Sequence, residues 1–224
     1  MSWEGRGPNR GGICSFVHEF INGEAEMTGH PVKFYSVGGR GREPILYVDD
    51  VIFMGNNYKL LMNLKNKFMK IWECRDLGPI KEYLGMTIKR DRKNHSMSLD
   101  QIEYSKKIVK RFGLEECNPV RTPLPSGYQP KENSDKANSK DRSYYQSIIG
   151  SLLYLALGTR FDIAQSVIMM SQFMVNPSHE HIQKSLHIVR YVSSTLKAKI
   201  TYRTSGGEDF KAYCDADWGM DKND

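Results

Sequence analysis

Two short apolar runs separated by a pair of aspartates constrain the fold of this chain more than any other feature. Residues 45–48 and 51–54 are rich in β-branched and aromatic side chains, and Asp49 and Asp50 stand between them. Such runs around a polar dipeptide are typical of a β-hairpin. Two adjacent carboxylates at an apolar turn are costly unless they are exposed or bind cations. The sequence therefore predicts a hairpin whose tip presents Asp49 and Asp50.

Size and composition narrow the class of protein. The chain has 224 residues, of which 39% are hydrophobic and 26% charged, as is usual for a globular protein. No apolar run approaches the roughly 18 residues of a membrane span, and the first residues lack the apolar centre of a secretory signal. We therefore expect an intracellular protein, cytoplasmic or nuclear, that has no membrane partner. The four cysteines are too widely spaced for a zinc motif or a disulfide framework.

Positive charge is concentrated in one part of the chain. Residues 58–121 contain 15 Lys and Arg against 8 Asp and Glu, whereas the whole chain carries a formal charge of +6. A basic block inside a folded segment is typical of a protein that binds a phosphate backbone. The alternative is a helix face that is merely solvated, and charge alone favours neither.

Apolar periodicity predicts the other elements. A helix should follow the hairpin and bury a stripe of Leu60, Leu64, Phe68 and Ile71. Residues 101–112 should form a second helix that ends at Gly113. Three more helices are predicted over residues 143–157, 162–174 and 178–196, the last with Ser178 as its N-cap.

The remaining segments are predicted to be strands, turns and a linker. Residues 83–89 and 200–203 look like strands, and a hairpin turn is expected around residues 93–94. Residues 119–140 are rich in Pro, Ser, Asn and Lys and offer little apolar surface to bury, so they are predicted to be a linker.

Long segments of the sequence resemble one known family. They include ILYVDDVIFMGNN, DLGPIKEYLGMTIKR, SLDQIEYSKKIVKRFGLEECNPVRTPL and YYQSIIGSLLYLALGTRFDIAQSVIMMSQF, and they follow one another in family order. From residue 45 to residue 224 the chain resembles the reverse transcriptase domain of copia-type retrotransposon Pol polyproteins.

The resemblance implies an α+β fold. It would comprise part of a reverse transcriptase palm sheet, a helical thumb and connection, and the first strands of an RNase H-like fold. The expected divisions are a poorly ordered, non-family segment 1–43, palm end and thumb 44–118, linker 119–140, helical connection 141–197 and an incomplete RNase H-like start 198–224.

The resemblance also assigns site residues. Asp49 and Asp50 would be catalytic and would hold Mg²⁺ for two-metal nucleotidyl transfer, and Asp215 would be a metal ligand of the RNase H-like part. The turn that grips the primer end would be Tyr83, Leu84, Gly85 and Met86, although a plain strand is the alternative there. Contacts to the backbone of an RNA/DNA template-primer would come from Lys106, Lys107, Lys110 and Arg111.

Several departures from the family bear on activity. The family needs another Asp on a strand upstream of the hairpin, and residues 1–48 contain none. The sequence continues for only nine residues after Asp215, and Phe161 stands where the family usually has Pro. We therefore expect a truncated reverse transcriptase fragment that is catalytically incomplete. A non-catalytic nucleic-acid-binding remnant and a retroelement relic without function remain alternatives, and the sequence does not indicate the oligomeric state.

Overall fold

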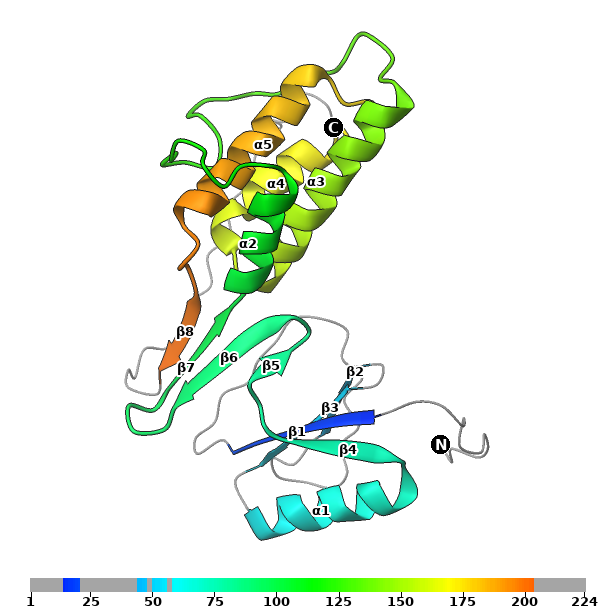
Figure 1. The fold of residues 1–224 in the computed structure, drawn as a ribbon, viewed down its shortest axis with the longest axis vertical. Helices are drawn as coiled ribbons and strands as arrows, with labels where there is room; N and C mark the ends of the chain where they lie inside the picture. The colour runs from blue at the N-terminus through cyan, green and yellow to red at the C-terminus, as the bar shows by residue number, and fades with distance from the viewer. Residues whose placement is uncertain (1–13, 21–43, 48–49, 56–57, 204–224) are drawn as a thin grey trace, which may run out of the picture.

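The computed structural model describes residues 14–20, 44–47, 50–55 and 58–203 of the chain (Figure 1). These residues form two four-stranded sheets and a helical bundle, with the second sheet lying between the first sheet and the bundle. The predicted α+β class is confirmed. None of the described helices has the length and apolarity needed to cross a membrane.

The first sheet contains the predicted hairpin. Its strands are β1 (Cys14–Phe20), β2 (Pro44–Tyr47), β3 (Asp50–Gly55) and β4 (Cys74–Pro79), in the order β2-β3-β1-β4. Strands β2 and β3 are antiparallel, and Tyr47 pairs with Asp50 at their connected ends, which confirms the hairpin. Val48 and Asp49 lie outside the described residues.

Strand β1 differs from the expectation that residues 1–43 are poorly ordered. It lies between β3 and β4 and pairs in parallel with both. Sequence reasoning missed it because Ser15, His18 and Glu19 interrupt the apolar residues of this short segment. Its backbone groups find partners on strands that are distant in sequence, and pairing on both sides stabilises a strand of weak local pattern. The rest of residues 1–43 lies outside the described part of the chain.

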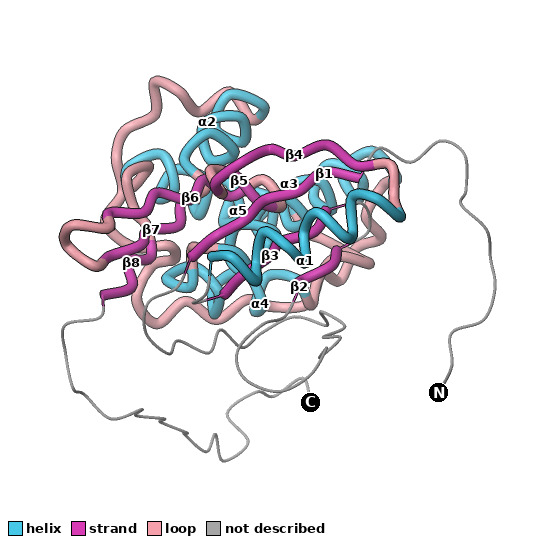
Figure 2. Tube along the Cα trace, turned by 90° about the horizontal axis from the view of Figure 1, so that it is seen from below, coloured by secondary structure: helices cyan, strands magenta, loops and turns pink. Residues whose placement is uncertain are grey.

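Helix α1 (Tyr58–Ile71) covers one face of the first sheet (Figure 2). Its inner face contains Leu61, Leu64 and Phe68, and the Phe68 ring meets that of Phe53 edge to face at 5.7 Å. The predicted stripe is therefore wrong at its two ends, since Leu60 is 39% exposed and Ile71 is 72% exposed.

Lys65 lies on the inner face of α1 rather than in solvent. Its side chain is 1% exposed, and its ammonium group donates a hydrogen bond to Asp76 of β4. The inward positions 61, 64, 65 and 68 follow helical spacing and share Leu64 and Phe68 with the predicted stripe. A lysine can occupy that face because Asp76 satisfies its charge.

The second sheet is antiparallel. It contains β5 (Glu82–Tyr83), β6 (Met86–Asp91), β7 (Ser96–Asp100) and β8 (Ile200–Arg203), in that order. The predicted continuous strand over residues 83–89 is wrong, because Leu84 and Gly85 form a tight turn with φ of 49° and 71°. Positive φ at both central residues is the geometry of a type I′ hairpin turn. The turn predicted around residues 93–94 is confirmed, with the Asn94 amide donating to Asp91 at 3.0 Å.

Strand β8 lies in the segment 198–224, where the incomplete RNase H-like start is expected. It pairs along β7, with Leu99 opposite Ile200 and Ser96 opposite Arg203. The unpaired edge of β7 offers it a ladder of backbone groups. Residues 204–224, which include the second expected strand and Asp215, lie outside the described residues.

The helical bundle confirms the predicted helices. It contains α2 (Ile102–Arg111), α3 (Ser139–Gly158), the 3₁₀ helix η1 (Phe161–Ile163), α4 (Ala164–Ser171) and α5 (His179–Ser194). Gly113 ends α2 with φ of 66°, and the Leu114 amide donates to the Val109 carbonyl at 3.0 Å. This is the Schellman arrangement, and it accounts for the glycine. The bundle core includes Ile163, Val167 and Met170, all fully buried.

Ser178 caps α5 as predicted. Its hydroxyl oxygen accepts from the His181 amide at 3.2 Å, and its own amide donates to Nδ1 of His181 at 3.1 Å. The His181 ring is 1% exposed and stacks on Phe173 at 4.1 Å. Burial lowers the pKa of His181, which favours the neutral ring whose Nδ1 can accept this bond.

The linker is irregular up to α3, as predicted, but it is packed against α5. The Val120 amide donates to the Ser194 hydroxyl at 3.0 Å, and Arg190 donates to the Asn118 carbonyl at 3.0 Å. Leu124 and Tyr128 pack on the bundle core. The expectation that this segment has little apolar surface to bury is wrong for these two side chains.

A buried arginine joins η1 to the residue that follows α5. Arg160 is 2% exposed, and its guanidinium donates to both carboxylate oxygens of Asp162, at 2.9 and 2.8 Å. It also donates to the Thr195 hydroxyl at 2.6 Å, and its guanidinium carbon lies 5.6 Å from the centre of the Tyr191 ring. Burial would raise the pKa of Asp162, but the hydrogen bonds and charge of Arg160 hold it below its ordinary value.

Candidate nucleic-acid interface

Asp50 is the one predicted metal ligand that the structure describes. It begins β3 and is half-buried beside the hairpin connection. Asp49 and Asp215 lie outside the described residues. Among the residues that are described, no three His, Cys, Asp or Glu side chains lie together as a metal site would require.

Strand β1, which pairs with β3 of the hairpin, lies upstream in sequence, where the family needs another Asp. Strand β1 runs parallel to β3, and its residue in register with Asp50 is Ser15. Glu19, the carboxylate of β1, pairs with Met54, four residues farther along the strand. At a rise of about 3.3 Å per residue, this places its backbone about 13 Å beyond Ser15. The neighbouring strand thus has a serine at the position where a carboxylate would adjoin Asp50.

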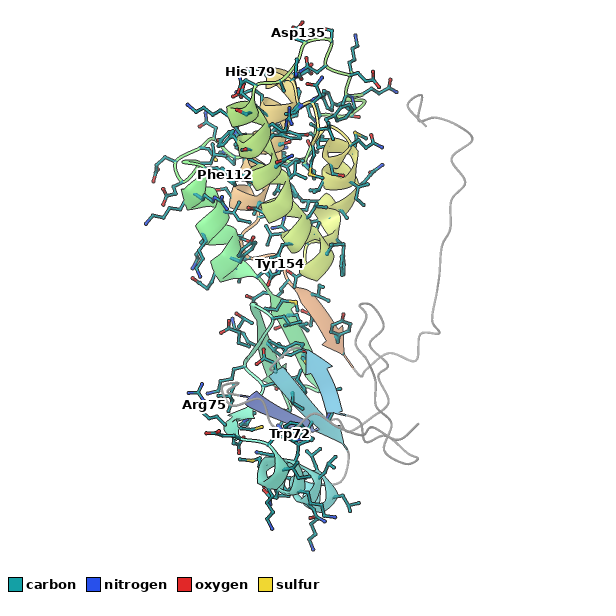
Figure 3. The ribbon with its side chains drawn as sticks, turned by 90° about the vertical axis from the view of Figure 1, so that its right-hand side faces the viewer. Trp72, Arg75, Phe112, Asp135, Tyr154 and His179 are labelled. Atoms are coloured by element: carbon teal, nitrogen blue, oxygen red, sulfur yellow. The ribbon has the colours of Figure 1, made fainter. Side chains whose placement is uncertain are left out.

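The predicted primer-grip residues form the turn between β5 and β6. Tyr83 pairs with Met86, and Leu84 and Gly85 lie between them. A residue from the bundle reaches this turn, since the hydroxyl of Tyr154 on α3 donates a hydrogen bond to the Leu84 carbonyl. The Tyr154 ring meets the Tyr104 ring of α2 edge to face at 4.6 Å. Figure 3 shows Tyr154 at the end of the bundle that faces the strands.

One small cavity joins the turn to α2. It has a volume of about 240 Å³ and is lined by Glu82, Gly85, Thr87, Gln101, Glu103, Tyr104, Lys107 and Tyr154. The sequence analysis assigned Gly85 to the primer-grip turn and Lys107 to the backbone contacts. In the structure both residues line this one cavity. Gln101 helps to build it, since its buried side chain accepts from the Thr159 hydroxyl at 2.9 Å and donates to the Tyr154 carbonyl at 3.4 Å.

The predicted cations of α2 lie on its exposed face. We call Lys106, Lys107, Lys110 and Arg111 the α2 cations, and all four side chains are exposed. Lys106 forms an ion pair with Glu103 at 2.8 Å, and its ammonium lowers the pKa of that carboxyl. The opposite face of α2 is fixed in the bundle core by Ile108 and Val109. The helix therefore holds an array of cations on a rigid support.

The basic block of the sequence is divided in space. Lys67 and Lys70 are exposed on α1. However, α1 lies on the side of the first sheet away from the bundle, so both sheets lie between α1 and α2 (Figure 1). Of the α2 cations, Lys107 lines the cavity that Gly85 of the turn also lines.

Sequence reasoning missed Tyr154, Tyr104 and Gln101 as site residues. Each lies in or beside a helix and carries no motif of its own. Tyr154 meets Leu84 across 70 positions of sequence, so no local signal could have revealed the contact.

The fold and the site define an α+β protein with an exposed cationic helix beside a hairpin turn, and comparison with known proteins gives its family. The family described as "Reverse transcriptase (RNA-dependent DNA polymerase)" matches residues 32–126, beginning inside the segment 1–43 that the resemblance had left out. The chain belongs to the reverse transcriptase family of copia-type, retrovirus-related Pol polyproteins.

Individual relatives cover most of the chain. It is 35% identical over 185 residues to the "Retrovirus-related Pol polyprotein from transposon TNT 1-94" of Nicotiana tabacum, which covers 79% of this chain and 14% of that protein. It is 33% identical to the "Uncharacterized mitochondrial protein AtMg00810" of Arabidopsis thaliana, covering 78% of this chain and 70% of the relative. The "Retrovirus-related Pol polyprotein from transposon RE1" of Arabidopsis thaliana is 34% identical, and the match covers 80% of this chain and 12% of that protein. No solved structure matches significantly.

Proposed function

We propose that this polypeptide binds an RNA–DNA template-primer through the phosphate backbone and does not by itself catalyse nucleotide transfer. The observation that carries the proposal is the α2 cations, which stand exposed beside the turn of residues 83–86 and share a cavity with it through Lys107. In this proposal the sheets correspond to the palm end of a reverse transcriptase, and the bundle to its thumb and connection.

The electrostatic part of the proposal follows from the exposure of these side chains. A cation that contacts a phosphate releases the counterions condensed on the duplex, which favours binding at low salt. Three of the α2 cations have no ion-pair partner among the described residues, and Lys106 shares its charge with Glu103. Contacts of this kind bind the backbone without reading the bases, so no sequence preference is expected.

The test is the affinity for a short RNA–DNA duplex over a range of salt concentration. If about four phosphates are contacted, log affinity should fall against log salt with a slope of roughly −4. A slope near zero would contradict the proposal. Failure to bind at any salt would favour the alternative of a retroelement relic without function.

The residues near Asp50 support the proposal that this polypeptide does not catalyse nucleotide transfer. In the family, Asp49 and Asp50 would hold Mg²⁺, which would stabilise the charge that develops during nucleotidyl transfer. A two-metal site needs a further carboxylate, and the residue in register with Asp50 on β1 is Ser15. Residues 1–48 contain no Asp. Both observations support a site with too few ligands.

The polypeptide of these 224 residues is therefore expected not to extend a primer on an RNA template with Mg²⁺ or Mn²⁺. Loss of a single electrostatic group typically slows catalysis by about 10²–10³-fold, and this site would lack the ligand set as a whole. Incorporation of labelled nucleotide is the measurement. Incorporation that is lost in Asp49→Asn but kept in Asp135→Asn, a change in an exposed loop far from the hairpin (Figure 3), would contradict the expectation.

A further inference from the structure

We infer that Tyr154 is a positioning residue, whose hydroxyl group fixes the turn formed by Leu84 and Gly85 so that the helical bundle sets how this turn meets a primer end. The inference rests on the proposed function and deepens it. It assigns a role to a side chain of α3, about 70 residues away from the turn in sequence.

The contacts of Tyr154 favour positioning over simple packing. Its hydroxyl donates to the Leu84 carbonyl, while its ring rests on Tyr104 and its own carbonyl accepts from Gln101. The side chain is 41% exposed. Water could satisfy an exposed hydroxyl, so the bond to Leu84 is not required merely to pair a buried polar group.

The turn needs an external contact of this kind. Leu84 has φ of 49°, a left-handed conformation that is unfavourable for a leucine. A hydrogen bond to the carbonyl of that residue holds the peptide plane in this orientation. Through the bond, a movement of α3 relative to the second sheet would change the direction of the turn.

Gly85 shows how closely the turn is pressed against Tyr154. A Cβ atom added at Gly85 would lie 2.5 Å from the Tyr154 hydroxyl oxygen and 3.7 Å from the ring carbon that bears it. Removal of the hydroxyl alone would therefore make room for an alanine. Gly78 provides a control, because it has φ of 75°, close to the 71° of Gly85, but nothing within 4 Å of its Cβ position.

The contact can be tested without nucleic acid by a double-mutant cycle on melting temperature. Gly85→Ala should lower the melting temperature by about 4 °C or more beyond the effect of Gly78→Ala, because both carry the same backbone strain and only the first meets Tyr154. In a Tyr154→Phe background this difference should disappear. Additive effects of Gly85→Ala and Tyr154→Phe would overturn the inference.

Positioning is then tested by binding. Wild-type protein is expected to prefer an RNA–DNA duplex with a recessed primer end over a blunt duplex of equal length, and Tyr154→Phe should reduce this preference about fivefold, as expected for one hydrogen bond. Tyr144→Phe is the matched control, since Tyr144 lies on the same helix, is 40% exposed, and packs on Phe112 instead of the turn.

The outcomes separate the inference from the proposed function. Wild-type protein that binds no duplex refutes the proposed function and the inference with it. Salt-dependent binding with no preference for recessed ends, or a Tyr154→Phe variant that keeps the wild-type preference, overturns the inference alone. A loss in Tyr154→Phe that Tyr144→Phe shows equally also overturns it.

Discussion

Arg160→Met is expected to lower the free energy of unfolding of the helical bundle by about 3 kcal/mol, near the lower end of the range for breaking a buried ion pair. The substitution removes the two-pronged bond to Asp162 and the bond to the Thr195 hydroxyl from a side chain that is 2% exposed. A loss near the lower end of this range is expected because the Asp162 side chain is 39% exposed, so water can hydrate its carboxylate once Arg160 is removed. Urea unfolding followed by far-UV circular dichroism gives the measurement.

Two further variants test the cause of this loss. Arg160→Met combined with Asp162→Leu should recover much of the stability, since no carboxylate is then left without its partner. Arg160→Lys should recover little, because an ammonium group cannot reproduce the planar, two-pronged contact. Lys106→Ala, which breaks an exposed ion pair, should lower the stability far less, because solvent screens that pair. If Arg160→Met is no less stable than Lys106→Ala, the network does not hold the bundle together.

The second large effect is expected on binding. Simultaneous change of the four α2 cations to alanine should weaken affinity for an RNA–DNA duplex at about 0.1 M salt by a factor on the order of 10³. The slope of log affinity against log salt should rise from roughly −4 to near zero, since each lost phosphate contact removes about one unit. The fold should persist, because all four side chains are exposed and alanine favours helix.

A control variant that loses the same charge elsewhere distinguishes a binding site on α2 from a general effect of net charge. Lys59, Lys67 and Lys70 of α1 and Arg75 of β4 are also exposed, and their two elements belong to the first sheet and its helix, which the second sheet separates from α2 (Figure 1). Changing these four to alanine should reduce the slope by less than one unit. Equal weakening by the two fourfold variants would show that overall charge, rather than the α2 surface, attracts the duplex.

The elements that the sequence predicted correctly depend on residues close together in the chain. The β2–β3 hairpin follows from two apolar runs around a polar pair. The end of α2 follows from Gly113, at the position where the helix end requires positive φ. The start of α5 follows from Ser178, whose hydroxyl accepts a hydrogen bond from the amide three residues later. Each of these interactions is completed within a few residues. The exposed α2 cations belong to the same group, because helical spacing alone places them opposite Ile108 and Val109.

The sequence by itself determined the α+β class, the family resemblance, and most helices and turns. Only the tertiary structure decided that β1 lies between β3 and β4 with Ser15 beside Asp50, that β8 pairs with β7, and that Lys65 is buried against Asp76. It also brought Tyr154 to the turn at Leu84. The physical reason is that these interactions join residues distant in the chain, or depend on which face of an element its neighbours cover. Periodicity can show that α1 has an apolar face, but the sheet beneath it determined the exact residues of that face.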